Sequence, residues 1–285
     1  MLELETRLAQ QSMVISTQYP VMVVGGAEDK VNGCDILTAF FESAGGSAAK
    51  IGIIPCASRE PTVVGDRYYQ IFQKMGAQQV QVLDIRYRNE CDEARWLEIL
   101  NDCTGVFVTG GDQLRLCDLV GGTELIKTIK QKVALGQLKL AGTSAGAAMM
   151  GDRMIAGGSS GESPNQTLVE LTEGLGIIPE LLVDQHFHNR NRMARLMSAV
   201  AANPDKLGVG IDEDTCAALD GSGVFQVLGK GTVTVIDPGS LTHTNYPQAD
   251  AAHPLSLHNL KVHVLSKGDR YDYKNRAVLA NSGVR

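Results

Sequence analysis

The sequence has few of the residues that would mark an unusual class of protein. It contains 6 cysteines and 1 tryptophan among 285 residues, and only 5% of the residues are aromatic. So few cysteines exclude a disulfide-stabilised scaffold. The sequence has no CxxC pair and no CxxC…HxxxH arrangement, which argues against structural zinc. We therefore expect reduced thiols in an ordinary globular protein.

Long apolar segments and an excess of positive charge are also missing. The uncharged stretch over residues 140–151 is much shorter than the ~18 residues that a membrane-spanning helix needs. With 32 acidic and 26 basic residues, the net charge of -6 provides no field that would attract a polyanion. The first 20 residues lack the apolar core and cleavage site of a secretory signal. We expect a cytoplasmic protein that binds neither membrane nor nucleic acid.

Glycine is the residue in excess, and apolar runs alternate with helical periodicity along the first half of the chain. The 31 glycines make up about 11% of the sequence, against a usual ~7%. Strands are expected at 21–24, 50–55, 80–83, 105–109 and 138–142, and helices at 35–43, 63–75, 92–100, 124–135 and from 145 onward. Because these strands are apolar throughout, the sequence predicts an α/β fold with a mostly parallel sheet and helices on both faces.

The pattern changes beyond residue 180. A strand over 181–187 and a helix over 192–202 precede short alternating segments near residues 209, 217, 224 and 233, and a last strand is expected at 261–265. We interpret these segments as antiparallel hairpins that form a β-rich C-terminal extension at the sheet edge. Because no linker composition separates the halves, we expect one α/β domain over 19–285 after a polar arm over 1–18.

The segment Gly142-Thr143-Ser144-Ala145-Gly146 has the G-x-S-x-G pattern in an informative context. An apolar strand precedes it, and small residues able to begin a helix follow. A sharp strand-to-helix turn of this kind projects the serine above the sheet, and the flanking glycines avoid collisions with neighbouring backbone. An ordinary glycine-rich turn is the alternative, but the context favours Ser144 as a nucleophile.

A serine nucleophile needs a base, and His186 is the best candidate among the six histidines. It ends the expected strand 181–187, at the sheet terminus where active sites of α/β proteins gather. Alternation along a strand would place Asp184 on the same face, so Asp184 is the third triad member that spacing favours. The remaining histidines lie in polar segments that are typical of surface loops, or, like His188, are poorer fits.

Two further segments are candidates for binding. The turn Gly110-Gly111 follows an apolar strand and can direct backbone N–H groups at a tetrahedral oxyanion. Neither this turn nor Gly25-Gly26 completes the G-x-G-x-x-G pattern of a dinucleotide site. Arg190, Arg192 and Arg195 form a basic cluster beside His186 that can bind carboxylates bidentately, although a solvated helix face is an equal alternative.

Four stretches together resemble the cyanophycinase family of serine peptidases, to which α-aspartyl dipeptidases also belong. They are TGGDQLRL (109–116), AGTSAGAA (141–148), GESPN (161–165) and VDQHFHNRNRMARL (183–196). The resemblance implies a fold similar to class I glutamine amidotransferase domains and a homodimer without metal or cofactor. It also implies hydrolysis of cyanophycin, a polyaspartate with arginine on each β-carboxyl, to β-Asp-Arg dipeptides through an acyl-enzyme.

The resemblance also implies roles for individual residues. Ser144 is the expected nucleophile, His186 the general base and Glu162 the third triad member, in place of Asp184. The oxyanion hole is expected from the backbone N–H groups of Ala145 and of the Gly110-Gly111 turn. The residues expected to line the substrate pocket are Gln113, Asp184, Gln185, Arg190, Arg192 and Arg195. There the arginines would hold substrate carboxylates, and Asp184 would receive a substrate guanidinium.

Three alternatives remain open at this point. The chain is an α-aspartyl dipeptidase if it cleaves ordinary α-aspartyl bonds, although the arginine cluster favours the polymer. A non-catalytic binding module of the same fold would have no need of a complete triad. A glutamine amidotransferase would use a thiolate, whereas the nucleophile position here is Ser144.

Overall fold

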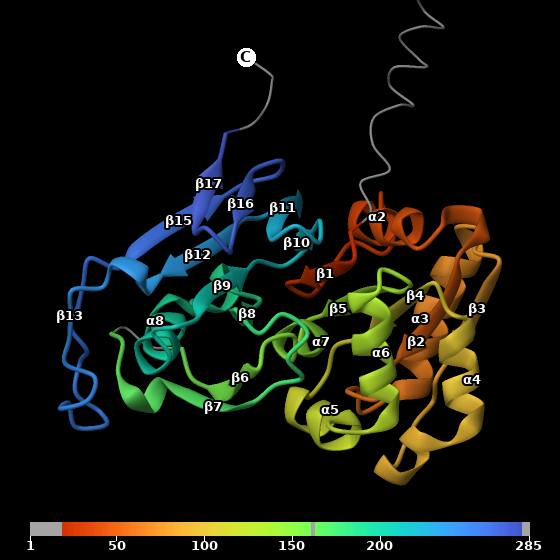
Figure 1. Cartoon of the computed structure of the whole chain (residues 1–285), viewed down its shortest axis with the longest axis horizontal. Coiled ribbons are helices and arrows are strands. Elements are labelled where there is room, and N and C mark those ends of the chain that lie inside the picture. The colour runs from red at the N-terminus through yellow and green to blue at the C-terminus, as the bar shows by residue number, and fades with distance from the viewer. Residues whose placement is uncertain (1–18, 161–162, 281–285) are drawn as a thin grey trace, which may run out of the picture.

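The computed structural model describes residues 19–160 and 163–280, which form two main β-sheets with helices around them (Figure 1). The larger sheet has nine strands in the order β17-β16-β11-β10-β1-β5-β4-β2-β3. Its parallel part consists of β1 (Val21–Val24), β5 (Lys139–Thr143), β4 (Gly105–Val108), β2 (Lys50–Ile54) and β3 (Gln79–Val82). Its antiparallel part consists of β10 (Thr215–Leu219), β11 (Val224–Gly229), β16 (Arg270–Asp272) and β17 (Ala277–Leu279).

Helices cover both faces of the parallel part, as the apolar strands predict. One face carries α2 (Asp35–Ser43) and α3 (Pro61–Lys74). The other carries α4 (Ala94–Asp102), α5 (Gln113–Val120), α6 (Glu124–Ala134) and the short α7 (Ala145–Ala148). Successive residues of β1 point to opposite faces, so Val21 and Val23 pack on the α6 side and Met22 and Val24 on the α2 side. Both faces of the strands are therefore buried.

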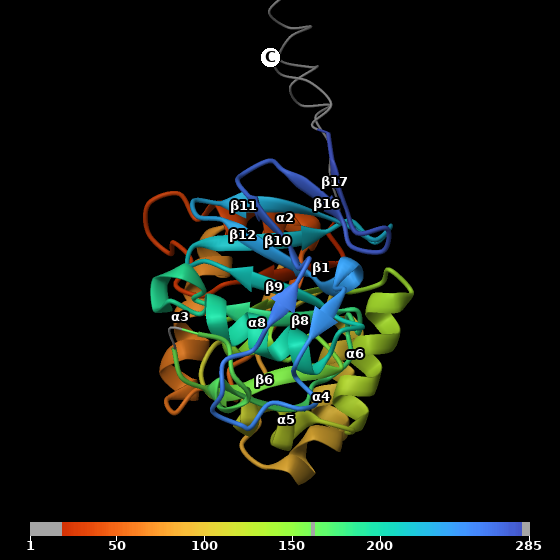
Figure 2. The ribbon, with the colours of Figure 1, turned by 90° about the vertical axis from the view of Figure 1, so that its left-hand side faces the viewer.

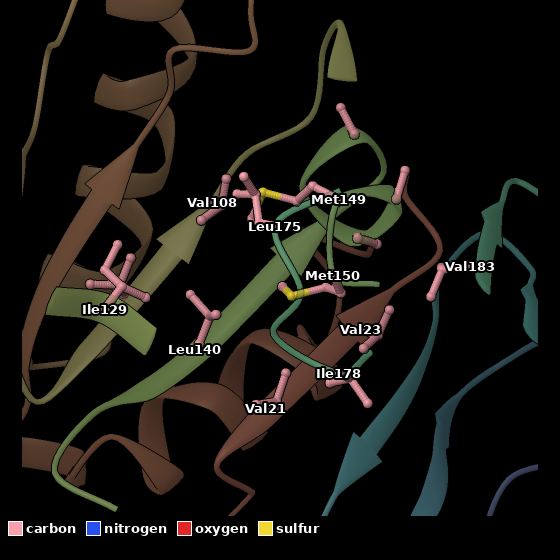
Figure 3. Packing of buried hydrophobic residues seen from close by; sticks show 14 of the residues in the cluster. Val21, Val23, Val108, Ile129, Leu140, Met149, Met150, Leu175, Ile178 and Val183 are labelled. Carbon is pink, nitrogen blue, oxygen red and sulfur yellow. The ribbon is translucent and has the colours of Figure 1, made fainter. Parts of the chain in front are cut away.

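The second sheet lies beside the first and shares its main core. Its four strands, in the order β15-β12-β9-β8, are β15 (Lys261–Leu265), β12 (Val233–Asp237), β9 (Leu207–Ile211) and β8 (Leu181–Gln185). Figure 3 shows Val183 of β8 and Val23 of β1 on the same side of the core, while Met149 lies beside Val108 and Leu175. The opposite face of this sheet packs against α8 (Met193–Ala202), which lies beside β8 and β9 in Figure 2.

Two small hairpins complete the described elements. They pair β6 (Arg153–Gly158) with β7 (Val169–Glu173), and β13 (His243–Thr244) with β14 (Leu257–His258). Across the described ranges, no helix combines the length and the apolar character needed to cross a bilayer.

The structure confirms the expected parallel sheet and its helices, but the strands beyond residue 180 are arranged differently from the prediction. Strands β10 and β11 extend the edge of the large sheet, as expected. By contrast, β9 and β12 belong to the second sheet, and β9 pairs with β8 in parallel. This difference matters because the carboxyl ends of neighbouring parallel strands meet at one edge. The β6–β7 hairpin and α5 were not expected, and the arm 1–18 lies outside the described residues.

Candidate active site

Ser144 lies on the sharp turn between β5 and α7, as the G-x-S-x-G pattern predicts. Its backbone has φ 53° and ψ -110°, which is a strained conformation for a residue other than glycine. The backbone N–H of Ser144 donates to Val24 O at 3.0 Å, a typical length for such a hydrogen bond. The turn is thus held by the neighbouring strand, and the hydroxyl stands at the carboxyl end of the sheet.

The two flanking glycines permit this turn because backbone passes very close to each of them. A Cβ on Gly142 would lie 2.1 Å from the carbonyl oxygen of Gly146. A Cβ on Gly146 would lie 2.6 Å from the carbonyl oxygen of Val108 in β4. Any larger residue at either position would push the helix away from the strand. The two glycines of the pattern therefore have the predicted steric role, which is to let the strand and the helix approach closely.

His186 follows β8 directly and faces the serine. Its Nε2 lies 2.9 Å from Ser144 Oγ, and its backbone N–H donates to Gly25 O at 2.8 Å. The imidazole packs against Gly26, where a Cβ would lie 2.4 Å from His186 Cε1. The Gly25-Gly26 pair therefore makes room for the histidine. This role accounts for the two glycines without a dinucleotide-binding site.

The other imidazole nitrogen, His186 Nδ1, lies 2.6 Å from Glu213 Oε1. Glu213 is in the short turn Asp212–Asp214 that joins β9 to β10, and Asn189 Oδ1 accepts its backbone N–H at 3.0 Å. Ser144, His186 and Glu213 thus form a hydrogen-bonded triad in the order that serine peptidases use. It stands where the two sheets meet, because β9 belongs to one and β10 to the other.

Glu213 was not predicted from the sequence, and the two carboxylates that were predicted for this place have different outcomes. Asp184 does not share a face with His186, because β8 ends at Gln185 and His186 has φ 48°, which breaks the alternation. That interpretation was wrong. Glu162, which the resemblance implied, lies outside the described residues. The carboxylate that the structure places on His186 belongs to Glu213.

A signal for Glu213 was present in the sequence. The acidic run Asp212-Glu213-Asp214 comes directly after the apolar segment 207–211. Register pairs Gln185 with Ile211 in the parallel β8–β9 ladder, so the residues after each strand emerge side by side. An edge hairpin near residue 209, as predicted, would not place Glu213 beside His186.

Burial and charge both act on the base. Burial lowers the pKa of His186 below its ordinary value of 6.5, while the hydrogen bond to Glu213 raises it and the positive charge of Arg190 lowers it further. The imidazole is only 8% exposed, which accounts for the dominance of burial. The free base is therefore neutral, and ready to accept a proton, at neutral pH.

The basic cluster divides into a buried pair and two more accessible arginines. Arg195 and Asp184 are 4% and 1% exposed, and Arg195 Nε donates to Asp184 Oδ2 at 2.9 Å. Arg192 is half-buried, and its guanidinium donates to the backbone oxygen of Gln185 and to Asp184 Oδ1 at 3.3 Å. Burial lowers the pKa of Arg192 to about 10, against the opposing effect of Asp184. Arg190 is exposed.

The Gly110-Gly111 turn passes beside the nucleophile. A Cβ on Gly110 would lie 3.1 Å from Ser144 Cβ, and Gly111 has φ 148°. Within residues 19–160 and 163–280, no backbone acceptor takes the N–H groups of Gly110, Gly111 or Ala145. These three groups are therefore the backbone donors near the turn that can be considered for an oxyanion hole.

The two glutamines of the expected pocket have different neighbours. Gln113 begins α5, and its Nε2 donates to Ala156 O at 2.6 Å, which ties α5 to β6. Gln185 Oε1 lies 3.4 Å from Ser144 Oγ. Among the described residues, no group of three or more His, Cys, Asp and Glu side chains is arranged to hold a metal ion.

Comparisons with known proteins identify the family of this chain. Residues 21–227 match the model of peptidase family S51. A protein from Trichormus variabilis (strain ATCC 29413 / PCC 7937) named cyanophycinase is 56% identical over 277 residues, covering 97% of this chain and 93% of that protein. One of the same name from Geminocystis herdmanii (strain PCC 6308) is 56% identical over 260 residues, covering 91% and 96%.

A solved structure has a similar fold. The crystal structure of a peptidase from an acI-B1 Actinobacterium superposes with a TM-score of 0.63 at 22% identity, covering 88% of this chain and 96% of that one. The family match spans β1 through β11 and includes Ser144, His186 and Glu213. The chain therefore belongs to peptidase family S51.

Proposed function

We propose that the protein is a serine exopeptidase that hydrolyses cyanophycin, multi-L-arginyl-poly-L-aspartate, to β-Asp-Arg dipeptides. The hydrogen-bonded triad Ser144–His186–Glu213 is the observation that carries the proposal, since a binding protein would not need it. The relatives named cyanophycinase, at 56% identity over nearly the whole chain, support the choice of substrate.

The triad assigns a role to each member. Ser144 Oγ attacks a backbone carbonyl of the polyaspartate while His186 Nε2 takes the hydroxyl proton. His186 then gives this proton to the leaving amine, so that the peptide bond breaks and an acyl-enzyme remains on Ser144. A water molecule, deprotonated by the same nitrogen, hydrolyses that ester. Glu213 holds the proton on Nδ1 and stabilises the imidazolium that forms in each step.

The oxyanion of each tetrahedral intermediate needs donors close to Ser144. We assign this role to the backbone N–H groups of Gly110, Gly111 and Ala145, which have no backbone acceptor among the described residues. Backbone donors are fixed before the reaction begins, so they stabilise the developing charge without reorganisation.

The substrate pocket uses the basic cluster unequally. We assign the substrate carboxylates to Arg190, which is exposed, and to Arg192, whose side chain is 11% exposed. The buried pair Asp184–Arg195 lies behind Arg192 and fixes its orientation through Asp184. Gln113 and Gln185 complete the pocket on either side of Ser144.

Incubation of the purified protein with cyanophycin tests the proposal. We expect β-Asp-Arg as the sole small product in a mass-spectrometric time course, and much slower release from α-Asp-Xaa dipeptides. Free arginine would instead indicate cleavage of the side-chain isopeptide bond. A ladder of larger fragments would indicate endopeptidase action. The absence of any product from folded protein would refute the proposal.

The lowered pKa of His186 predicts how activity depends on pH. Because only the neutral imidazole accepts the serine proton, kcat/KM is lost as the pH falls through the pKa of His186. Burial places this pKa below 6.5, so the acid limb of a kcat/KM profile is expected below pH 6.5. An Arg190→Met variant, which removes a positive charge, should move the limb to higher pH. A wild-type limb above pH 7 would contradict the assignment.

The same proposal covers the organisation of the chain. We propose that residues 19–285 form one peptidase domain of the class I glutamine amidotransferase type, with a β-rich C-terminal extension. The arm 1–18 precedes it. A cytoplasmic homodimer without nucleic-acid partners is the form that we expect to act on the polymer.

A further inference from the structure

A cavity of about 790 Å³ lies outside the triad, between α5, α6 and the end of β7. Leu114 and Asp118 line it from α5, Lys127 from α6 and Glu173 from β7. None of the triad residues contributes to it. The active-site chemistry described above therefore does not account for this hollow.

A second cavity, of about 440 Å³, lies at the beginning of α5. It is lined by Gly111 of the oxyanion turn, by Gln113 and by Ala156. Leu114 lines both cavities and is 40% exposed. The two hollows thus follow one another along α5, and the series begins beside the donors assigned to the oxyanion.

The large cavity carries charges of both signs. Arg88 and Lys130 already use part of their donor capacity on backbone oxygens. Arg88 donates to Asp118 O, and Lys130 donates to Leu175 O at 2.9 Å. The side chain of Lys127 is 60% exposed, and its ammonium group lies 2.7 Å from Glu124. The carboxylates of Asp118 and Glu173 are exposed. The surface thus offers both cations and anions to a ligand.

We propose that this groove along α5 is a second binding site, which holds the cyanophycin chain beyond the units bound at Ser144. The inference rests on the proposed function. Each polymer side chain ends in an arginine whose carboxylate and guanidinium are both free, so a surface of mixed charge complements it. A helix of 8 residues spans about 12 Å, and an extended chain advances about 3.4 Å per residue. The groove therefore accommodates roughly three to four polymer residues.

Reversing the two exposed carboxylates tests the groove. In a Ser144→Ala background, which removes turnover, Asp118→Lys with Glu173→Lys is expected to weaken binding of the long polymer about tenfold. Binding of a two-unit β-Asp-Arg oligomer should change less than about twofold, because it does not reach beyond Leu114. Dissociation constants from titration at low ionic strength measure both effects.

A matched pair of reversals provides the control. Asp66→Lys with Glu98→Lys makes the same change of charge at exposed positions of α3 and α4, away from both cavities, and should leave polymer binding unchanged. The proposed binding site would be refuted if both double variants weakened polymer binding equally. It would also be refuted if Asp118→Lys with Glu173→Lys left polymer binding unchanged. Failure of the wild-type protein to release dipeptides would refute the proposed function instead. The two failures are therefore distinguishable.

Discussion

Ser144→Ala is expected to lower kcat on cyanophycin by about 10⁶-fold while binding of the polymer changes little. Without the hydroxyl, His186 has no proton to accept and no acyl-enzyme forms. The oxyanion donors and the basic cluster remain in place, so a small residual rate over the uncatalysed reaction should persist. Because alanine has the same backbone requirements as serine at φ 53°, the substitution removes chemistry without a new source of strain.

The measurement is the rate of dipeptide release at saturating polymer, with the dissociation constant as a second readout. Ser222→Ala, in an exposed turn before β11, is the matched control and should behave as the wild type. A fluorophosphonate should label the wild type at Ser144 and leave the alanine variant unmodified. Turnover within tenfold of the wild type in Ser144→Ala would show that another group is the nucleophile.

Local features of this site could be predicted from the sequence because they depend on neighbouring residues. The turn at Ser144 requires glycines two residues before and after it, and the structure places backbone oxygens within 2.6 Å of a Cβ at either position. The parallel strands could be recognised because burial on both faces leaves them apolar throughout. Both signals lie within a few residues of the feature that they predict.

The third member of the triad could not be found in that way. Glu213 reaches His186 because β8 and β9 pair in parallel. Paired residues of these strands, such as Gln185 and Ile211, are 26 positions apart in the sequence. Nothing local distinguishes this pairing from an edge hairpin. The alternation that favoured Asp184 fails because His186 adopts φ 48°, a conformation that the sequence does not reveal.

The basic cluster illustrates a different limit. Its three arginines look alike in the sequence, but Arg195 is 4% exposed and bound to Asp184, whereas Arg190 is exposed. Burial of the pair follows from the position of α8 against the second sheet. A charge pattern therefore identified the right region, and only the tertiary structure separates the exposed Arg190 from the buried Arg195 and from Arg192, whose side chain is 11% exposed.

Glu213→Gln is expected to lower kcat by about 10⁴-fold, the effect of the equivalent change in other serine peptidases. The Gln amide keeps the shape of the side chain but carries no charge to stabilise the imidazolium. Its NH₂ group can also donate to Nδ1, which would leave the proton on Nε2, facing Ser144, where it blocks the transfer. Dipeptide release at saturating polymer measures the loss.

Glu162→Gln makes the same chemical change at the residue that the family resemblance favoured, and it should retain kcat within a few-fold of the wild type. A large loss in Glu162→Gln together with a small one in Glu213→Gln would reverse the assignment. Circular dichroism and thermal unfolding of both variants distinguish a loss of chemistry from a loss of folding.

The pH profile separates a catalytic role of Glu213 from a merely structural one. The hydrogen bond from His186 to Glu213 raises the pKa of the imidazole, in opposition to burial. Removing the negative charge therefore lowers this pKa, so the acid limb of kcat/KM should move to lower pH even as the maximum falls. A carboxylate that only braced the β9–β10 turn would reduce activity without moving the limb. The direction of the shift thus tests whether Glu213 acts on His186 through its charge.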